Sequence, residues 1–189
     1  MLNNKDTKAL LCESFKKQLL KHPFDKITIK MITDEAGVIR PTFYNYYRDK
    51  YEVFEYILDE ELMNVTYILM DNGMIKEAIK MIFTYFGNNR SFFHEAFKVE
   101  GQNSFEDILL TRISILFQRI IKKRNIKIKD TTGMLSTEYI ARYYSIGLVY
   151  ILKTWILNES MSEITVDEMF NAYMCMITHP LFDVLEKSF

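Results

Sequence analysis

A run of donor-rich side chains between residues 39 and 50 has the chemistry of a surface that contacts nucleic acid. Guanidinium, amide, hydroxyl and ammonium groups can bond base edges in the major groove or phosphate oxygens, and residues 39 to 48 include no carboxylate. Arg40 is the first candidate for a guanine contact, because its fork can meet O6 and N7 together, and a phosphate contact is the alternative. The candidate contact residues are Thr28, Lys30, Ile39, Arg40, Pro41, Thr42, Tyr44, Asn45, Tyr46 and Lys50.

Residues that commonly perform acid–base, nucleophilic or metal chemistry are sparse and poorly spaced. His22, His94 and His179 lack a Cys, an Asp or a second His at ligand spacing, and Ser145 lacks a Gly-x-Ser-x-Gly turn. His94 precedes Glu95, but adjacent residues on a helix do not face each other, so we expect a solvated face there. No phosphate loop or dinucleotide fingerprint occurs in the sequence. We therefore expect no enzyme, no metal and no cofactor.

The donor-rich run lies on the second of two short predicted helices. The Thr28 hydroxyl can cap the first helix, and Gly37 can leave that helix in a left-handed conformation at no steric cost. Helicity resumes near Arg40, because Pro41 suits a first turn whose N–H groups lack intrahelical partners. The side chains expected to close the small core are Ile29, Ile32, Ala36, Val38, Phe43 and Tyr47. Spacing alone fits any three-helix core, whereas the residue types favour a helix-turn-helix that reads DNA.

These residues resemble the N-terminal signature of the TetR/AcrR family of dimeric bacterial transcription factors. The signature combines a capping Thr, an Ala-Gly-Val turn, a Thr-aromatic-Tyr run, a bulky ring and a Lys at the head of a long helix. The residues in register with it are Thr28, Ala36, Gly37, Val38, Thr42, Phe43, Tyr44, Tyr47 and Lys50. The resemblance spans roughly residues 5 to 66. Ile39 departs from it, because the family often has Ser or another small polar cap there, so Ile39 either touches a thymine methyl or packs.

The resemblance implies roles for the candidate residues. Residues matching Tyr44 and Lys50 usually grip phosphates in that family, and those matching Arg40, Asn45 and Tyr46 tune the choice of sequence. The DNA partner would be a double-stranded, pseudo-palindromic operator.

The charge distribution agrees with this orientation toward DNA. The 189-residue chain has a net charge of −1, but residues 1 to 50 contain ten Lys or Arg against six Asp or Glu. Residues 51 to 189 contain fourteen and nineteen, respectively. A basic head on an acidic body steers the head toward a phosphate backbone.

Helical periodicity continues to the end of the chain, with only six Gly and three Pro to interrupt it. We expect an all-α fold: a three-helix DNA-binding domain over residues 1–50, followed by a helical ligand-sensing and dimerisation domain over residues 51–189. Helices are expected at about 5–21, 74–86, 91–100, 104–125, 136–158 and 166–179, the last starting at a Thr165–Glu168 capping box. A connecting helix should open at Asp49, with Glu52 as a capping-box-like partner. Its expected inward side chains are Phe54, Ile57, Leu58, Leu62, Val65 and Ile68.

The segments 139–158 and 166–177 are apolar over more of their circumference than one buried stripe requires. A second chain is therefore expected to cover part of them, giving a homodimer. The resemblance implies a four-helix interface made by the last two long helices of each subunit, and residues 139–158 are similar to the C-terminal sensor domain of the family's Firmicutes branch. Gly147 would allow a close helix approach. Two-fold symmetry would set two reading helices in major grooves about 34 Å apart, or a multiple of that.

The excess of aromatic residues in the body suggests an apolar cavity for a small apolar or aromatic effector, although such residues more often form plain core. The candidate lining residues are Phe86, Phe97, Phe117, Tyr143 and Trp155. We expect a repressor whose DNA affinity an effector changes. The alternative is a coactivator or protein-interaction module of the same fold with a protein partner.

The two cysteines, Cys12 and Cys175, lie in apolar helical surroundings without metal spacing. They are expected to be buried thiols of a reducing cytoplasm. The longest apolar stretch, at residues 146–152, is too short to span a bilayer, and no signal peptide is evident, so we expect a cytoplasmic protein without a membrane partner.

Overall fold

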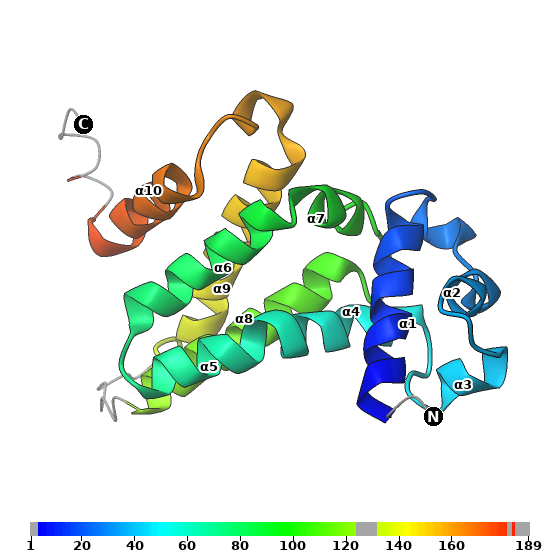
Figure 1. The fold of residues 1–189 in the computed structure, drawn as a ribbon. Coiled ribbons are helices and arrows are strands. Elements are labelled where there is room, and N and C mark those ends of the chain that lie inside the picture. The colour runs from blue at the N-terminus through cyan, green and yellow to red at the C-terminus, as the bar shows by residue number, and fades with distance from the viewer. Residues whose placement is uncertain (1–3, 124–131, 181–182, 184–189) are drawn as a thin grey trace.

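The computed structural model describes residues 4–123, 132–180 and 183, and this part of the chain is helical without strands, as predicted. Helices α1 (Asn4–Leu19), α2 (Ile29–Glu35) and α3 (Arg40–Tyr44) form a small group at one end of the molecule (Figure 1). Two 3-10 turns, η1 (Phe24–Lys26) and η3 (Glu159–Met161), connect helices. The body consists of α4 (Lys50–Leu58), a π-helical turn η2 (Asp59–Met63), α5 (Asn64–Asp71), α6 (Ile75–Asn88), α7 (Arg90–Ala96), α8 (Phe105–Lys123), α9 (Thr137–Leu157) and α10 (Val166–Thr178).

The predicted helices after residue 70 are present, with ends shifted by a few residues. The start of α10 has the predicted capping box: the Glu168 N–H donates to Thr165 Oγ1 at 3.3 Å, and the Thr165 N–H donates to Glu168 Oε2 at 2.8 Å. Across the ranges 4–123 and 132–180, no helix is both long and apolar enough to cross a membrane.

The core of the N-terminal group continues directly into the connecting helix. Phe15 of α1 and Phe54 of α4 meet edge to face, with ring centroids 4.9 Å apart, and Phe24 stacks on Phe54 at 5.5 Å. The inward side chains of α1 are buried, namely Leu11, Cys12, Phe15 and Leu19. This shared aromatic core fixes the direction in which α4 leaves the group.

The π-helical turn η2 changes which face of the connecting helix points inward. Before and within the turn, the expected inward side chains are buried: Phe54, Ile57, Leu58 and Leu62. After it, the expectation is wrong, because Val65 and Ile68 are 39% and 62% exposed, whereas Thr66 and Met70 are buried. A π turn takes one more residue than an α turn, so it rotates the downstream face by about one position. The Thr66 hydroxyl donates to the Leu62 carbonyl at 2.7 Å within this stretch.

Glu61, in the π turn, joins the N-terminal group to the body. The Lys16 ammonium on α1 donates to both Glu61 carboxylate oxygens, at 2.5 and 2.8 Å, and the Tyr85 hydroxyl on α6 donates to Oε2 at 2.8 Å. Burial works against the charge of Lys16, but the hydrogen bonds and negative charges of Glu61 and Glu13 together outweigh it, so the pKa of Lys16 lies above its ordinary value. One carboxylate thus connects α1, the π turn and α6.

A second acidic group of the same helix is tied to α8. Arg112 donates to Asp59 through two nitrogens, at 2.8 and 3.0 Å, and to Glu55 at 3.0 Å. The side-by-side run of α4, α5 and α8 in Figure 1 is consistent with this pairing. Bidentate arginine–carboxylate pairs have defined geometry, so this contact fixes the rotation of the connecting helix against the body.

Gly87 of α6 permits a close approach of other helices within the body. A Cβ atom at this position would lie 2.7 Å from Val166 Cγ2 and 3.0 Å from Trp155 Cη2. Trp155 is held in place by its indole N–H, which donates to the Ile164 carbonyl at 3.2 Å. By contrast, a Cβ at Gly147 would have nothing within 4 Å in this chain, so any close approach there involves another molecule.

We predict that Lys16 and Glu61 stabilise the fold cooperatively. Lys16→Met and Glu61→Gln should each lower the free energy of unfolding by about 1–2 kcal/mol, because each leaves a partly buried polar group unpaired. The double variant should cost less than the sum, with a coupling energy of about 1 kcal/mol from urea unfolding. The exposed pair Lys17–Glu35, at 3.2 Å, is the matched control and should couple by less than about 0.5 kcal/mol. If the two losses of unfolding free energy simply add in the double variant, the Lys16–Glu61 ion pair does not stabilise the fold.

Candidate nucleic-acid interface

The start of α2 and the turn after it have the predicted local chemistry. Thr28 is the N-cap residue, and its Oγ1 accepts a hydrogen bond from the Met31 N–H at 3.2 Å. Gly37 has φ +67°, in the left-handed region, and open space lies around the position of a Cβ. The turn therefore requires glycine for its backbone conformation and not for close packing.

Two buried aromatic side chains hold α3 against the N-terminal core. Phe43 and Tyr47 are almost fully buried, and their ring centroids are 5.4 Å apart. The Tyr47 hydroxyl lies 3.0 Å from the Cys12 sulfur on α1 and donates to the Lys8 carbonyl at 3.3 Å. Sequence reasoning expected the apolar role of Tyr47 but missed this polar attachment to α1, which no local spacing could have indicated.

Helix α3 is short and presents a polar and aromatic outer face. Pro41 lies in its first turn, as predicted, and the helix ends at Tyr44 with Asn45 as its C-cap. The exposed residues on this face are Arg40, Pro41, Tyr44 and Asn45, whereas Thr42 and Tyr46 are partly buried. The Arg40 guanidinium donates to the Tyr44 hydroxyl at 3.1 Å, so these two side chains are already ordered as a pair.

Ile39 neither caps α3 with its side chain nor packs against the core. It occupies the N-cap position without a side-chain hydrogen bond and is 71% exposed. Of the two roles weighed from sequence, packing is excluded within this chain, and contact with a thymine methyl stays a prediction.

We call the exposed residues Arg40, Pro41, Tyr44 and Asn45 the reading face. The two lysines beside it differ in the number of hydrogen bonds that hold their ammonium groups. Lys30 makes an exposed ion pair with Asp34, at 2.5 Å, in the next turn of α2. Lys50 instead points toward the turn before α2, donating to the carbonyls of Phe24 at 2.6 Å and Ile27 at 3.0 Å, and burial lowers its pKa. A phosphate contact by Lys50 stays a prediction, and such a contact would compete with these two bonds.

The start of α4 is capped in a way that differs in part from the expected box. Asp49 accepts from the N–H groups of Tyr51 and Glu52, at 2.8 and 3.0 Å, as expected. The Glu52 carboxylate, however, accepts from the Arg48 N–H and its guanidinium, at 2.5 and 3.2 Å, and not from Asp49. The Arg48 guanidinium, at the edge of the reading face, is therefore already paired with a carboxylate.

One of the two expected buried thiols is buried and the other is only partly so. Cys12 is covered by the N-terminal core, and burial raises its pKa to about 12, so it stays a thiol at neutral pH. Cys175 of α10 is partly exposed, because α10 packs on the body along one side only.

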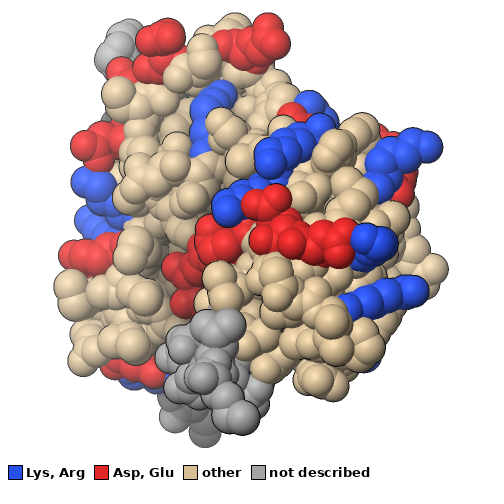
Figure 2. Space-filling model, turned by 45° about the vertical axis from the view of Figure 1, so that its right-hand side comes forward, with Lys and Arg blue, Asp and Glu red and all other residues tan. Residues whose placement is uncertain are grey.

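Charges on the face seen in Figure 2 are mixed. Lys and Arg side chains are scattered over its right-hand part, and Asp and Glu side chains form a band across the middle. The Lys and Arg side chains visible on this face therefore do not form one continuous patch.

Of the five residues proposed from sequence to line a ligand pocket, Phe86 and Phe97 lie together, with ring centroids 6.0 Å apart. Phe86, Phe97 and Trp155 are buried, and Phe86 stacks on Phe93 with ring centroids 3.9 Å apart, so this aromatic cluster is filled core. Phe117 is partly buried against Tyr144, and Tyr143 is 74% exposed on α9. Their residue types indicated apolar surroundings correctly, but not whether neighbouring rings would fill the space.

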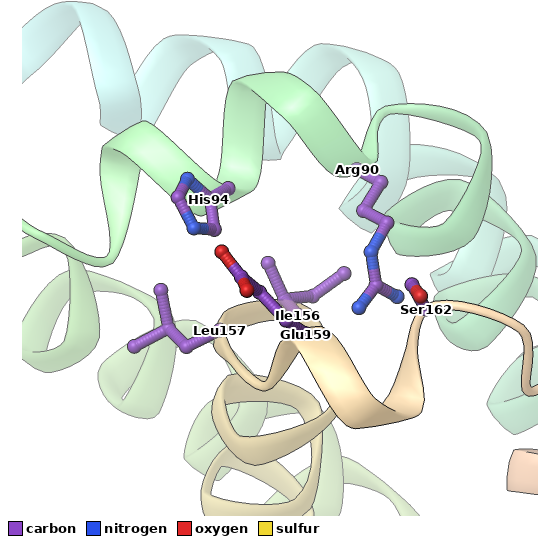
Figure 3. Close-up of a pocket in the computed structure, with 6 residues that line it drawn as sticks. All are labelled: Arg90, His94, Ile156, Leu157, Glu159 and Ser162. Atoms are coloured by element: carbon purple, nitrogen blue, oxygen red, sulfur yellow. The ribbon is translucent and has the colours of Figure 1, made fainter.

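A polar pocket of about 460 Å³ lies where α7 meets the end of α9 and the η3 turn. Figure 3 shows its lining, with His94 and Glu159 projecting into the same space and Arg90 beside Ser162. Arg90 donates to the Trp155 carbonyl at 2.6 Å and to the Asn158 carbonyl at 3.4 Å. The guanidinium thus satisfies carbonyls at the C-terminal end of α9, which is a structural role.

His94 corrects one expectation from sequence. Its Nδ1 lies 3.0 Å from Glu95 Oε1, so these adjacent side chains do meet. Burial opposes the charge of Glu95, but hydrogen bonds from Lys98 and His94 lower its pKa overall. The carboxylate therefore stays ionised and poorly suited to act as a proton donor. Within the described part of the chain, no cluster of three His, Cys, Asp or Glu residues could hold a metal ion.

Comparison with known proteins identifies both halves of the chain. Residues 73–179 match the family model "Transcriptional regulator C-terminal region", and residues 16–57 match "Bacterial regulatory proteins, tetR family". The chain is 20% identical over 171 residues to the HTH-type dhaKLM operon transcriptional activator DhaS of Lactococcus lactis subsp. lactis (strain IL1403), covering 90% of each protein.

Solved structures show the same fold. The dihydroxyacetone kinase operon activator DhaS superposes with a TM-score of 0.62 at 20% identity, covering 90% of this chain and 96% of that one. The fatty acid degradation regulator FadR from Bacillus halodurans gives 0.59 at 13% identity, covering 92% and 97%. The C-terminal model alone spans more than half of the chain and the N-terminal model spans the helix-turn-helix, so this chain is not an enzyme and belongs to the TetR family of bacterial transcriptional regulators.

Proposed function

We propose that this regulator binds a double-stranded, pseudo-palindromic operator as a homodimer in the cytoplasm, with α3 of each subunit in a major groove. One observation carries the proposal: α3 exposes a donor-rich face without carboxylates, while Phe43 on its opposite face and Tyr47, three residues after its end, are buried in the core. A helix so held can present side chains to base edges without ordering them first. DNA binding is assigned to residues 1–50, and sensing and dimerisation to residues 51–189.

The proposed contact residues fall into two groups, those that contact bases and those that contact phosphates. Arg40, the first residue of α3, is assigned to a guanine, and Asn45 and Tyr46, which follow the end of the helix, are assigned to tuning sequence choice. Tyr44 and the flanking Lys30 and Lys50 are assigned to phosphates. The residues assigned to further contacts along the groove are Thr28, Ile39, Pro41 and Thr42.

A stripe of exposed apolar residues on α9 supports the homodimer. Tyr139, Tyr143, Ile146 and Tyr150 are each more than half exposed and recur at alternating spacings of four and three. This heptad-like spacing keeps them on one side of the helix, where a second copy can cover them. We call these four residues the α9 stripe. Dimerisation through the α9 stripe would set the separation of the two α3 helices.

We propose repression as the mode of regulation, because a dimer bound at a promoter excludes polymerase by its volume. A small apolar or aromatic effector would act only through its different affinity for DNA-competent and DNA-incompetent states. The alternative is a coactivator that takes a protein partner, which the description of DhaS as an activator favours. Expression of a reporter gene fused to the regulated promoter, measured with and without this protein, distinguishes repression from activation.

DNA recognition is tested by fluorescence anisotropy with DNA from upstream of the chain's own gene, and with sequences selected from random DNA. The native protein should bind a selected site tightly, and Arg40→Ala should weaken it by about 1–3 kcal/mol while relaxing specificity at one base pair. Lys76→Ala, an exposed change on α6, should have no effect. If no DNA of either source is bound at low salt, the proposed function fails.

The roles of Lys30 and Lys50 can be distinguished by measuring both the salt dependence of DNA affinity and the thermal stability of each alanine variant. Lys30→Ala should lower the slope of log affinity against log salt by about 1 and leave thermal unfolding almost unchanged, because the Lys30 ammonium makes a solvent-exposed ion pair that contributes little to stability. Lys50→Ala should in addition lower thermal stability, since two carbonyl bonds are lost. An unchanged melting temperature for Lys50→Ala would mean that those bonds are not maintained in solution.

The proposed dimer is tested by light scattering coupled to size exclusion. The double variant Tyr143→Glu with Ile146→Glu should shift the mass to that of one 22.5 kDa chain and reduce operator affinity, because buried unpaired charges oppose association. Ile115→Glu on α8, which is also exposed, is the control and should leave the dimer intact. A native protein that is monomeric at micromolar concentration would contradict the dimer.

A further inference from the structure

Arg48 is an exposed cation in the turn that joins α3 to α4. It lies in the chain between Tyr44 and Lys50, both proposed as phosphate contacts, and its side chain is 81% exposed. Lys50 must release two carbonyl bonds before it can reach a phosphate. The Arg48 guanidinium instead contacts Glu52 through Nε, at 3.2 Å, and an exposed ion pair of this kind is weak. Of these two cations, Arg48 is therefore the more available to a DNA backbone.

The Glu52 carboxylate is held in place independently of the Arg48 guanidinium. Its Oε2 accepts from the Arg48 backbone N–H at 2.5 Å. The Glu52 side chain is 30% exposed, much less than that of Arg48. Glu52 also lies in the first turn of α4, where the partial positive charge of the helix N-terminus favours a carboxylate. The carboxylate therefore stays at this corner when the guanidinium moves to another partner.

A fixed carboxylate beside the cation changes the free energy of DNA binding. A phosphate that takes the Arg48 guanidinium leaves the Glu52 carboxylate without its counter-charge, close to a polyanion. The ion pair also has no net charge, so it releases fewer counterions from DNA than a lone arginine would. Glu52 thus competes with phosphate for the same guanidinium.

We propose that Arg48 is a further phosphate contact, and that Glu52 competes for it and so limits the affinity of this regulator for DNA of any sequence. The inference rests on the proposed function, because it concerns the same interface. A backbone contact carries no direct base information. Glu52 therefore affects the strength and the salt dependence of binding, and the choice of base pairs by α3 is unchanged.

Glu52→Gln is the direct test, because its amide oxygen can still accept from the Arg48 N–H while the negative charge is lost. Affinity is measured by fluorescence anisotropy at several salt concentrations, with a selected operator and with an unrelated duplex. At about 0.1 M salt, Glu52→Gln should bind both DNAs about fivefold to tenfold more tightly, and its salt slope should steepen by about 1. Arg48→Ala should weaken binding to both DNAs and flatten the slope by about 1.

The double variant separates competition from simple charge repulsion. In an Arg48→Ala background, Glu52→Gln should tighten binding by about twofold or less, because only a screened repulsion is removed. Glu60→Gln is the matched control: it makes the same chemical change at an exposed residue of the π turn. At the rise of a helix, Glu60 lies about 12 Å further along, so this change should alter affinity by less than about twofold. Thermal unfolding of each variant checks that the start of α4 is intact.

Two results would overturn the proposal: an unchanged salt slope in Arg48→Ala, or an equal gain from Glu52→Gln with and without the Arg48 side chain. The first would mean that Arg48 contacts no phosphate, and the second that Glu52 only repels DNA. Because Arg48 is at an exposed turn position, the first result can be read even if Glu52→Gln fails to fold. Native DNA binding with either result rejects this inference alone, whereas no DNA binding at low salt rejects the proposed function and the inference together.

Discussion

The burial of Phe43 and Tyr47 behind α3 is the constraint on which the reading face depends. A five-residue helix has too few internal hydrogen bonds to hold its own shape, so packing must supply its stability. Phe43 supplies the apolar contact, and Tyr47 adds a polar attachment through Cys12 and the Lys8 carbonyl of α1. The outer residues of α3 are free to be polar because the inner ones carry the packing.

The same dependence extends into the body through one helix that is not regular. The π turn at Asp59–Met63 places Glu61 where Lys16 and Tyr85 can both reach it, while Arg112 holds Asp59 from the other side. The connecting helix is thus fixed to the N-terminal group, to α6 and to α8 through two carboxylates that lie two positions apart in the chain. A rearrangement among α6 and α8 would reach the N-terminal group through these ionic contacts and the shared aromatic core.

Features governed by local chemistry could be predicted from the sequence. The Thr28 cap, the Gly37 turn and the Thr165–Glu168 box each depend on residues within four positions of one another. The π turn could not be predicted, because its ionic partners lie 45 and 53 residues away in the chain. Whether the five proposed lining residues share a cavity could not be predicted for a similar reason: residue type indicates that a side chain is buried, but only the packing of distant helices decides whether a space remains beside it.

Lys50 links the connecting helix directly to the N-terminal group formed by α1, α2 and α3. Lys50 is the first residue of α4, and its ammonium bonds two carbonyls of the segment that leads into α2. Phe54, one turn further along, packs against Phe15 and Phe24 of the same group. A tilt of α4 would therefore carry α1, α2 and α3 together and would distort none of them separately. In a dimer, such a tilt changes the distance between the two α3 helices, and an operator with fixed half-site spacing is sensitive to that distance.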